Sequence, residues 1–326
     1  MPHQVVASDY HMVRPEILRR TLDGTAAVTL ADLGSTDRLV DACERVDADA
    51  LITDIATPVT EEALARLDLS VVARAAVGFE NIDVAAAEEH GVVVTNVPGY
   101  CTDEVATHSV ALLLSAVRAI PEVDSRIGAG EWPEADSTAN EIHRLRGRTL
   151  GFVSFGAIAR RAAEMVGGFG LDLVAFDPYL DDGALDDLSV DVELVDFETL
   201  LDRSHYVSVN APATPETRGM FDAEAFARMR DDAVLVNTGR GAVVDEDALL
   251  TALDAGELDC AALDVFESEP LPADSPLRDR ADVVVTSHTG WHSVEASAEA
   301  NETAAADVRR VLRGETPENR VDPDWV

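Results

Sequence analysis

Short apolar runs alternate with amphipathic stretches along almost the whole chain. Such runs are typical of strands buried on both faces, and the stretches between them have the apolar spacing of helices. Strands separated by helices predict βαβ units, in which parallel strands form a sheet with helices on its faces. We therefore expect an α/β fold built from doubly wound, Rossmann-like sheets.

The strand-like runs fall into two series, which predict two domains. The first series is expected at residues 4–7, 26–30, 50–53, 71–73 and 92–95, and the second at 149–153, 173–176, 206–209, 233–236, 261–265 and 283–286. We assign residues 103–288 to one Rossmann domain. Residues 1–102 and 289–326 form the other, flavodoxin-like domain, which is discontinuous and closed by a helix over 294–312. A cleft between the two domains is the expected ligand site.

A long helical pattern runs from about Asp103 to Ile120 and is expected to end before Pro121. Valine and leucine recur on most of its sides, so little of its surface is polar. This pattern predicts burial between domains or between subunits. We expect a homodimer formed through this region.

Acidic residues outnumber basic ones by 62 to 25, giving a net charge of −37, and every basic residue is arginine. This balance excludes a nucleic-acid-binding surface. Self-repulsion of this size destabilises a compact chain in dilute buffer, whereas molar salt screens charges beyond roughly 3 Å. The composition predicts a protein adapted to a salt-rich cytoplasm. An ordinary acidic protein is the alternative, but it leaves the missing lysines unexplained.

Targeting signals and cysteine patterns add little. There is no apolar run of 18 or more residues, so no membrane span is expected. The first residues lack the pattern of a secretory signal, which favours the cytoplasm. Cys43, Cys101 and Cys260 are far apart and form no metal-ligand spacing, so they are interpreted as small buried hydrophobic residues.

The segment Ser154–Ala159 joins a predicted strand to a predicted helix, where a Gly-x-Gly-x-x-Gly dinucleotide loop would lie. Only the middle glycine, Gly156, is present, and Ser154 and Ala159 replace the outer two. The middle glycine lets the backbone approach a pyrophosphate at the helix N-terminus. An ordinary tight turn is the alternative interpretation.

Asp177 favours the dinucleotide interpretation. It follows the next predicted strand and lies 21 residues beyond Gly156. A carboxylate at this spacing accepts hydrogen bonds from the adenosine ribose of NAD and repels the 2′-phosphate of NADP. A solvated acid is the alternative, but its place directly after a strand supports a role in binding NAD.

Arg240, Glu269 and His288 each follow one of three successive predicted strands. Ligands of open α/β sheets bind beyond the carboxyl ends of the strands. An arginine binds a carboxylate through bidentate hydrogen bonds, a histidine exchanges a proton with a hydroxyl, and a glutamate orients that histidine. Each residue alone is unremarkable, but together they predict catalysis on a small acid without a metal.

With these residues the chain resembles the D-isomer-specific 2-hydroxyacid dehydrogenases over nearly its whole length. The matching segments are VGFENID (77–83), TNVPG (95–99), SFGAIA (154–159), TPETRG (214–219), NTGRG (237–241), DVFESEP (264–270) and SHTGW (287–291). Several motifs in the right order make the match specific. The chain is most similar to the branch that contains C-terminal-binding proteins and phosphoglycerate dehydrogenases.

The resemblance implies roles for further residues. It implies catalysis by Arg240, Glu269 and His288, and substrate contacts by Arg74, Val77, Gly78 and Trp291. The implied contacts to NAD are Thr107, Ser154, Phe155, Gly156, Ala157, Ile158, Ala159, Asp177, Ala211, Pro212, Thr217, Thr238, Gly239, Asp264 and Gly290. Asn210 departs from the family, many members of which have histidine there.

The sequence thus predicts an NAD-dependent D-2-hydroxyacid dehydrogenase, with His288 as the acid and base. Glyoxylate, hydroxypyruvate, 3-phosphoglycerate and branched keto acids all remain open as substrates. Two alternatives remain: an NAD(H)-sensing scaffold resembling the co-repressors of this branch, and a dehydrogenase of formate- or phosphite-like substrates.

Overall fold

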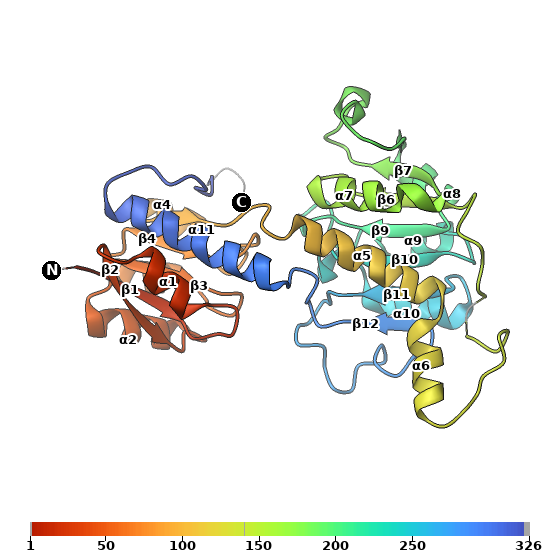
Figure 1. Ribbon diagram of the computed structural model, residues 1–326, viewed down its shortest axis with the longest axis horizontal. Helices are drawn as coiled ribbons and strands as arrows, with labels where there is room; N and C mark the ends of the chain where they lie inside the picture. Colours follow the sequence, from red (N-terminus) through yellow and green to blue (C-terminus); the bar gives the residue numbers. More distant parts are fainter. Residues whose placement is uncertain (1, 140, 323–326) are drawn as a thin grey trace. The chain divides into compact units, whose positions relative to one another are not determined.

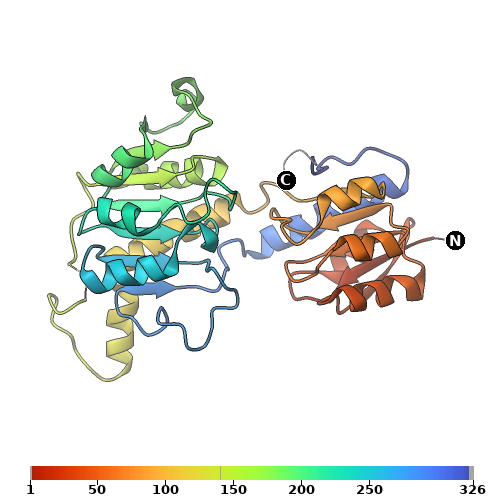
Figure 2. The same cartoon turned by 180° about the vertical axis from the view of Figure 1, so that it is seen from behind.

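A computed structural model describes residues 2–139 and 141–322 of the chain. The chain folds into two compact units. Unit 1 contains residues up to Cys101 together with those from His292 onward, and unit 2 contains Thr102–Trp291. Both units consist of parallel sheets with helices on both faces, which confirms the predicted α/β class (Figures 1 and 2).

Unit 1 is built on a five-stranded parallel sheet with strand order β2-β1-β3-β4-β5, the flavodoxin-like order. Helix α11 from the end of the chain packs beside α1 and against β4 (Figure 1). The elements are β1 (His3–Ser8), α1 (Pro15–Thr21), β2 (Ala26–Ala31), α2 (Thr36–Val46), β3 (Ala50–Thr53), α3 (Glu61–Arg66), β4 (Val71–Arg74), α4 (Val84–Glu89), β5 (Val93–Thr95) and α11 (Val294–Leu312).

Unit 2 is built on a seven-stranded parallel sheet with order β12-β11-β10-β9-β6-β7-β8. The order reverses between β6 and β9, which is where such sheets bind dinucleotides. The elements are α5 (Thr102–Val117), α6 (Ile120–Gly128), β6 (Thr149–Val153), α7 (Ala157–Val166), η1 (Gly167–Phe169), β7 (Asp172–Phe176), η2 (Asp182–Leu185), β8 (Glu193–Leu194), α8 (Phe197–Arg203), β9 (Tyr206–Val209), α9 (Ala223–Arg228), β10 (Val234–Asn237), η3 (Gly241–Val243), α10 (Glu246–Ala255), β11 (Cys260–Leu263) and β12 (Val283–Val285).

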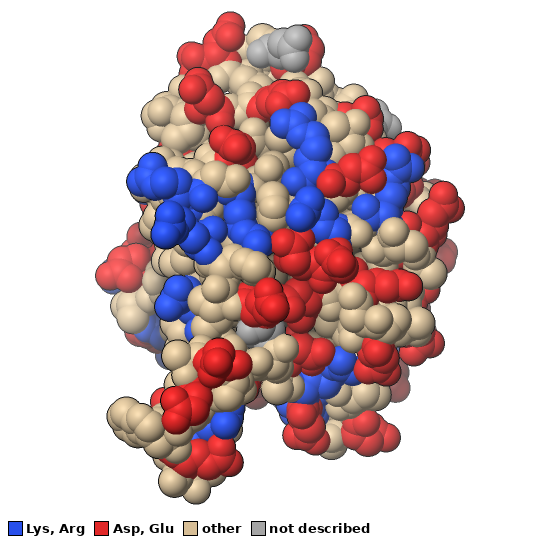
Figure 3. Space-filling model, turned by 90° about the vertical axis from the view of Figure 1, so that its right-hand side faces the viewer, with Lys and Arg blue, Asp and Glu red and all other residues tan. Residues whose placement is uncertain are grey.

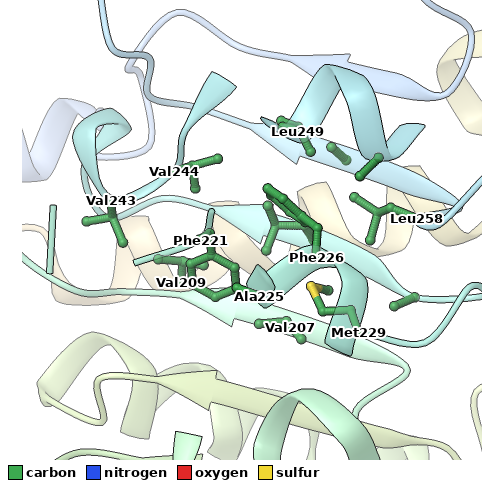
Figure 4. Close-up of a cluster of buried hydrophobic side chains, with 14 of the residues drawn as sticks. Val207, Val209, Phe221, Ala225, Phe226, Met229, Val243, Val244, Leu249 and Leu258 are labelled. Atoms are coloured by element: carbon green, nitrogen blue, oxygen red, sulfur yellow. The ribbon is translucent and has the colours of Figure 1, made fainter. Parts of the chain in front are cut away.

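Two apolar layers fix the unit 2 sheet in place. Helices α5 and α7 lie on one face, and α8, α9 and α10 lie on the other (Figures 1 and 2). Buried apolar side chains of these helices pack against the sheet on both faces. Figure 4 shows Phe221 and Phe226 in the second layer, packed between Val207, Val209 and Leu249, and all five are at most 1% exposed. Each such side chain stabilises the fold by about 1.5–3 kcal/mol. The packed layers hold the strand ends rigidly.

The prediction of one helix from Asp103 to Ile120 is wrong at its carboxyl end. Helix α5 ends at Val117, Ala119 adopts a left-handed conformation with φ 49°, and α6 begins at Ile120. Pro121 stands in the first turn of α6, where its missing N–H removes no helical hydrogen bond. The apolar character of α5 is explained within unit 2, because the helix packs on α7, β10 and β11. The expected burial between domains or subunits is not needed to account for it.

Candidate active site

The carboxyl ends of three neighbouring strands bring Arg240, Glu269 and His288 to one edge of the unit 2 sheet. Strands β10, β11 and β12 are adjacent and parallel, and their last residues stand in register. Arg240 and His288 each follow their strand by three residues, and Glu269 lies in the segment after β11. The edge predicted from the sequence therefore carries all three side chains.

His288 and Glu269 form a hydrogen-bonded pair. Nδ1 of His288 lies 2.7 Å from Oε2 of Glu269, and the Phe266 N–H donates to Oε1 at 3.0 Å. Burial raises the pKa of Glu269, but these hydrogen bonds and the imidazole charge outweigh it, so the pKa lies below its ordinary range. An ionised carboxylate only accepts, so Nδ1 carries a proton, and the proton exchange predicted from the sequence falls to Nε2.

The loop that carries Arg240 is held on both sides. The Asn237 side chain accepts from the Gly239 N–H at 3.0 Å and donates to the Arg240 carbonyl at 3.1 Å. A Cβ at Gly241 would lie 1.9 Å from the carbonyl carbon of Phe266. The Arg240 loop is thus pressed against the segment leading to Glu269, and only glycine allows this approach.

The segment after β12 is clamped by Asp264. The His288 N–H donates to the Asp264 carbonyl at 2.8 Å, and the Thr289 and Gly290 amides donate to its carboxylate at 3.0 and 2.9 Å. His288 itself has φ 54°, which is unusual for a residue with a side chain. These three hydrogen bonds hold it there. The resemblance implies a cofactor contact for Asp264, and in this structure its carboxylate also holds the segment that carries His288.

The loop between β6 and α7 has the features that a pyrophosphate requires. Gly156 is the N-cap of α7 and provides no side-chain cap, so the amides at this helix start remain for a ligand. A Cβ at Gly156 would meet no atom within 4 Å, so the space beside its backbone is open to a ligand. Ala159 is fully buried, as close packing of the helix on the sheet requires. The loop fits NAD.

Ser154 occupies the first glycine position, and its backbone is strained there. Its φ is 63°, in the left-handed region. A side chain in this region costs of order 1–3 kcal/mol. Its hydroxyl lies 3.4 Å from Oδ2 of Asp177, a weak contact that compensates little. The replacement of glycine by serine noted in the sequence thus falls where glycine is conformationally favoured.

Asp177 follows β7 and lies beside this loop. Its Oδ2 accepts from the Phe155 N–H at 2.9 Å, and its Oδ1 accepts from the Tyr179 N–H at 3.0 Å. Oδ2 also receives the weak Ser154 contact, whereas Oδ1 has a further lone pair for a ribose hydroxyl. Phe155 has a fully buried side chain, so it reaches the site only through its backbone.

Other predicted cofactor residues lie at the ends of β9 and β10 or on α5. They are Thr107, Ala211, Pro212, Thr217, Thr238 and Gly239. A Cβ at Gly239 would lie 2.7 Å from the Ala211 carbonyl, so these two segments touch. The Thr217 hydroxyl is used locally, since it donates to the Pro212 carbonyl at 2.5 Å. The Thr238 hydroxyl is buried with no hydrogen-bond partner among the described residues, which leaves it for a ligand.

The predicted substrate loop lies in unit 1. Arg74 is only 3% exposed, and its Nε donates to the Gly78 carbonyl at 2.8 Å. The Asn96 side chain donates to the Val77 carbonyl at 2.7 Å. Because a trans peptide directs its N–H opposite to its C=O, the Gly78 N–H points away from Asn96. Arg74 therefore supports the loop in this structure, and substrate contacts by Arg74, Val77 and Gly78 stay a prediction.

Sequence reasoning missed the supporting residues. Asn237 and Asn96 hold the backbones of the Arg240 loop and the substrate loop, and His108 contacts the segment after β12. Asn237 was detectable as a polar residue ending an apolar strand run. The Trp291 indole donates to the His288 carbonyl at 3.1 Å, so it also braces this segment, and its predicted substrate contact stays untested.

Residues 110–290 match the family described as "D-isomer specific 2-hydroxyacid dehydrogenase, NAD binding domain". The chain is 39% identical to a D-3-phosphoglycerate dehydrogenase of Mycobacterium leprae over 93% of its own length and 58% of that protein. It is also 39% identical to a glyoxylate reductase of Korarchaeum cryptofilum over 87% of its length and 86% of that protein. The chain spans little more than half of the phosphoglycerate dehydrogenases that it matches.

The fold comparison agrees. The TT0316 protein of Thermus thermophilus superposes with a TM-score of 0.87 at 30% identity, covering 98% of this chain and all of that one. The chain belongs to the D-isomer specific 2-hydroxyacid dehydrogenase family, and the residues that match its NAD-binding domain, 110–290, lie within unit 2. Within that family it stands with the phosphoglycerate dehydrogenase-like members, as the motifs predicted. None of the helices described is long and apolar enough to cross a membrane.

Proposed function

We propose that the chain is an NAD-dependent D-2-hydroxyacid dehydrogenase that works as a reductase of small 2-keto acids. The observation that supports this most directly is the His288–Glu269 pair, at the same sheet edge as Arg240. The pair provides a proton carrier with a fixed tautomer, and Arg240 provides a cation for a carboxylate. The dinucleotide loop lies on the same sheet.

The reaction follows from these roles. In the reductive direction His288 donates its Nε2 proton to the C2 oxygen, and C2 receives a hydride. In oxidation the hydroxyl proton moves to Nε2, the C2–H bond breaks and its electron pair leaves as hydride. NAD supplies the hydride acceptor or donor when bound. Arg240 holds the substrate carboxylate throughout, which fixes C2 in position.

A substrate panel tests this proposal. Purified protein in molar potassium chloride is mixed with NADH and, separately, glyoxylate, hydroxypyruvate, a branched keto acid and formate, while 3-phosphoglycerate is tested with NAD. Oxidation of NADH by at least one keto acid is expected. NADH binding without turnover of any acid would contradict the proposal and favour a scaffold, which the names of the relatives do not favour.

We expect NADH to be used at least about tenfold more efficiently than NADPH. The Asp177 carboxylate would face the 2′-phosphate, and an uncompensated charge contact costs about 1–3 kcal/mol, with 1.4 kcal/mol equal to tenfold. The measurement is kcat/KM with each cofactor. Asp177→Asn keeps one acceptor for the Phe155 and Tyr179 amides but loses the charge, so it should reduce the preference for NADH over NADPH. A wild type that prefers NADPH would refute this role of Asp177.

We propose that the chain forms a homodimer and that α6 contributes to the interface. Helix α6 has no buried residue, and the largest exposed apolar side chains of this region are Ile120, Ile127 and Trp132, at 54%, 41% and 87% exposed. A short helix with no buried face is marginal unless another surface covers it. The sequence placed the interface in the preceding helix, and the exposed apolar residues now favour α6.

Light scattering in molar salt should therefore give a dimer mass. Ile127→Asp combined with Trp132→Ser is expected to give monomers, because a charge would be buried at the interface. Val294→Ser, at another exposed apolar residue of 66% exposure, serves as the control and should remain dimeric. A monomeric wild type, or a double variant that stays dimeric, would contradict the assignment.

We propose that the protein works in a salt-rich cytoplasm and needs salt to stay folded. Figure 3 shows acidic side chains spread over one face with arginines between them. Exposed ion pairs such as Arg228–Glu198 and Arg203–Glu193 are screened by solvent, so they stabilise the fold too little to offset a net charge of −37.

The melting temperature should rise from low to molar potassium chloride. Replacing the exposed Asp186 and Asp187 with asparagine should raise the melting temperature in low salt. The increase should be smaller in molar salt, where the repulsion between acidic side chains is already screened. A melting temperature independent of salt would argue against the adaptation.

A further inference from the structure

His108 on α5 reaches the segment that carries His288, although the two are far apart in sequence. Its Nε2 lies 3.0 Å from Oγ1 of Thr286 and 3.3 Å from Oδ1 of Asp264. Its side chain is 23% exposed. Thr286 and Asp264 belong to the ends of β12 and β11, so His108 links helix α5 to both strands.

The direction of this hydrogen bond follows from its partners. The Thr286 hydroxyl lies 2.6 Å from Oδ1 of Asp264 and spends its only proton on that carboxylate. Its oxygen can then only accept from His108. Nε2 of His108 therefore carries a proton and donates to Oγ1, with Oδ1 of Asp264 as a longer second acceptor.

The ionised state of the Asp264 carboxyl depends on these hydrogen-bond donors. It is only 2% exposed, and burial alone raises its pKa. Hydrogen bonds from His108, Thr286 and the backbone of Thr289 and Gly290 outweigh burial and hold the pKa below its ordinary range. As an anion, Asp264 accepts from the two amides that follow His288. The shape of the catalytic segment thus depends on donors that keep this carboxylate charged.

The His108 ring also contacts the segment directly. A Cβ at Gly290 would lie 3.2 Å from Cδ2 of His108 and 3.0 Å from Oδ2 of Asp264. Gly290 therefore lies against both side chains. His288 keeps its positive φ only while its surroundings over-determine it, and these contacts are part of those surroundings.

We propose that His108 is a positioning residue, which donates through Nε2 into Thr286 and Asp264 and thereby holds His288 in its reactive conformation. The proposal rests on the proposed dehydrogenase function for its catalytic consequence, but the hydrogen bond itself can be tested without turnover. His108 touches neither His288 nor Glu269 in this structure's hydrogen bonds, so it acts through Asp264.

Two substitutions separate the effect of the His108 hydrogen-bond donor from the effect of the shape of its ring. His108→Phe keeps a planar ring but has no donor, and His108→Gln keeps a donor but has no ring. If the donor matters, His108→Phe should lower kcat about tenfold or more, while raising the Kd of NADH, measured by fluorescence, by a smaller factor. His108→Gln should recover most of that rate. His90→Phe, an exposed histidine of unit 1, is the control.

Thr286→Val tests the next link. It should lower kcat by a similar factor, and the double variant with His108→Phe should be no slower than the slower single variant, because both break one chain of hydrogen bonds. Equal losses in His108→Phe and His108→Gln, or fully additive losses in the double variant, would overturn the proposal.

A long-range ¹H–¹⁵N correlation spectrum of the wild type gives the independent readout. The His108 ring should carry its proton on Nε2 at neutral pH, and this assignment should survive in His288→Asn, where turnover is lost. A proton on Nδ1 alone would overturn the inference. A wild type inactive on every acid, with the Nε2 proton present, would instead refute the proposed function.

Discussion

His288→Asn is expected to bind NADH nearly as well as the wild type but to turn over about 10²- to 10⁴-fold more slowly. Asparagine has a similar size and polarity, so the segment clamped by Asp264 should keep its shape. It cannot carry a proton at neutral pH, so the C2 oxygen loses its acid and base. Steady-state kcat and fluorescence titration of NADH measure the two effects. Near wild-type turnover would show that another group carries the proton.

Glu269→Gln should lower kcat less than His288→Asn does. The Glu269 carboxylate lies 2.7 Å from Nδ1 of His288, where it fixes the tautomer and stabilises the positive charge of the imidazole. Glutamine keeps a hydrogen-bond acceptor but loses that charge, so kcat for keto-acid reduction should fall by a smaller factor. His90→Asn, at an exposed site in unit 1, is the matched control and should not change kcat.

Gly241→Ala should disrupt the site through the backbone. The added Cβ would lie 1.9 and 2.0 Å from the carbonyl carbon and oxygen of Phe266, and a backbone group cannot rotate away as a side chain can. Overpacking of this kind costs about 1–3 kcal/mol. The displaced loops carry Arg240 and Glu269, so kcat/KM should fall more than stability alone would suggest. Thermal melts and kinetics at a temperature well below the transition distinguish the two losses.

Gly168→Ala is the matched control for that change. Its Cβ would meet no atom within 4 Å, and its backbone has no positive φ. The variant should melt near the wild type and keep its activity. If Gly241→Ala behaved like Gly168→Ala, the close approach of the two loops would not be needed for catalysis.

The fold was largely predictable because strands and helices leave local patterns of apolar residues. These patterns can be recognised in the sequence without knowing any tertiary contact. The helix predicted over residues 294–312 is present with these bounds. Strand β8 was missed because two residues at a sheet edge carry no pattern. The break after Val117 was missed because nothing in the composition signals the left-handed Ala119.

The candidate site was predictable only as a set of residues. The sequence placed Arg240, Glu269 and His288 after strands, and parallel pairing necessarily brought those ends together. It could not show that Nδ1 rather than Nε2 of His288 meets Glu269, because hydrogen-bond partners depend on loop conformation. Nor could it reveal His108, whose partners lie far away in sequence and meet it only once the sheet is complete.

The discontinuous unit 1 has a consequence for how the chain acquires its fold. Helix α11 packs on α1 and against β4, yet all of Thr102–Trp291 separates it from them in sequence. Until α11 has been synthesised, the apolar surfaces of α1 and β4 that it covers are exposed, and such exposed surfaces are prone to association. Unit 2, continuous in sequence, can fold before α11 is made. A folded unit 2 joins the two parts of unit 1 by a rigid connection instead of a long flexible chain. Helix α11 can then pack on the unit 1 sheet with a smaller loss of chain entropy.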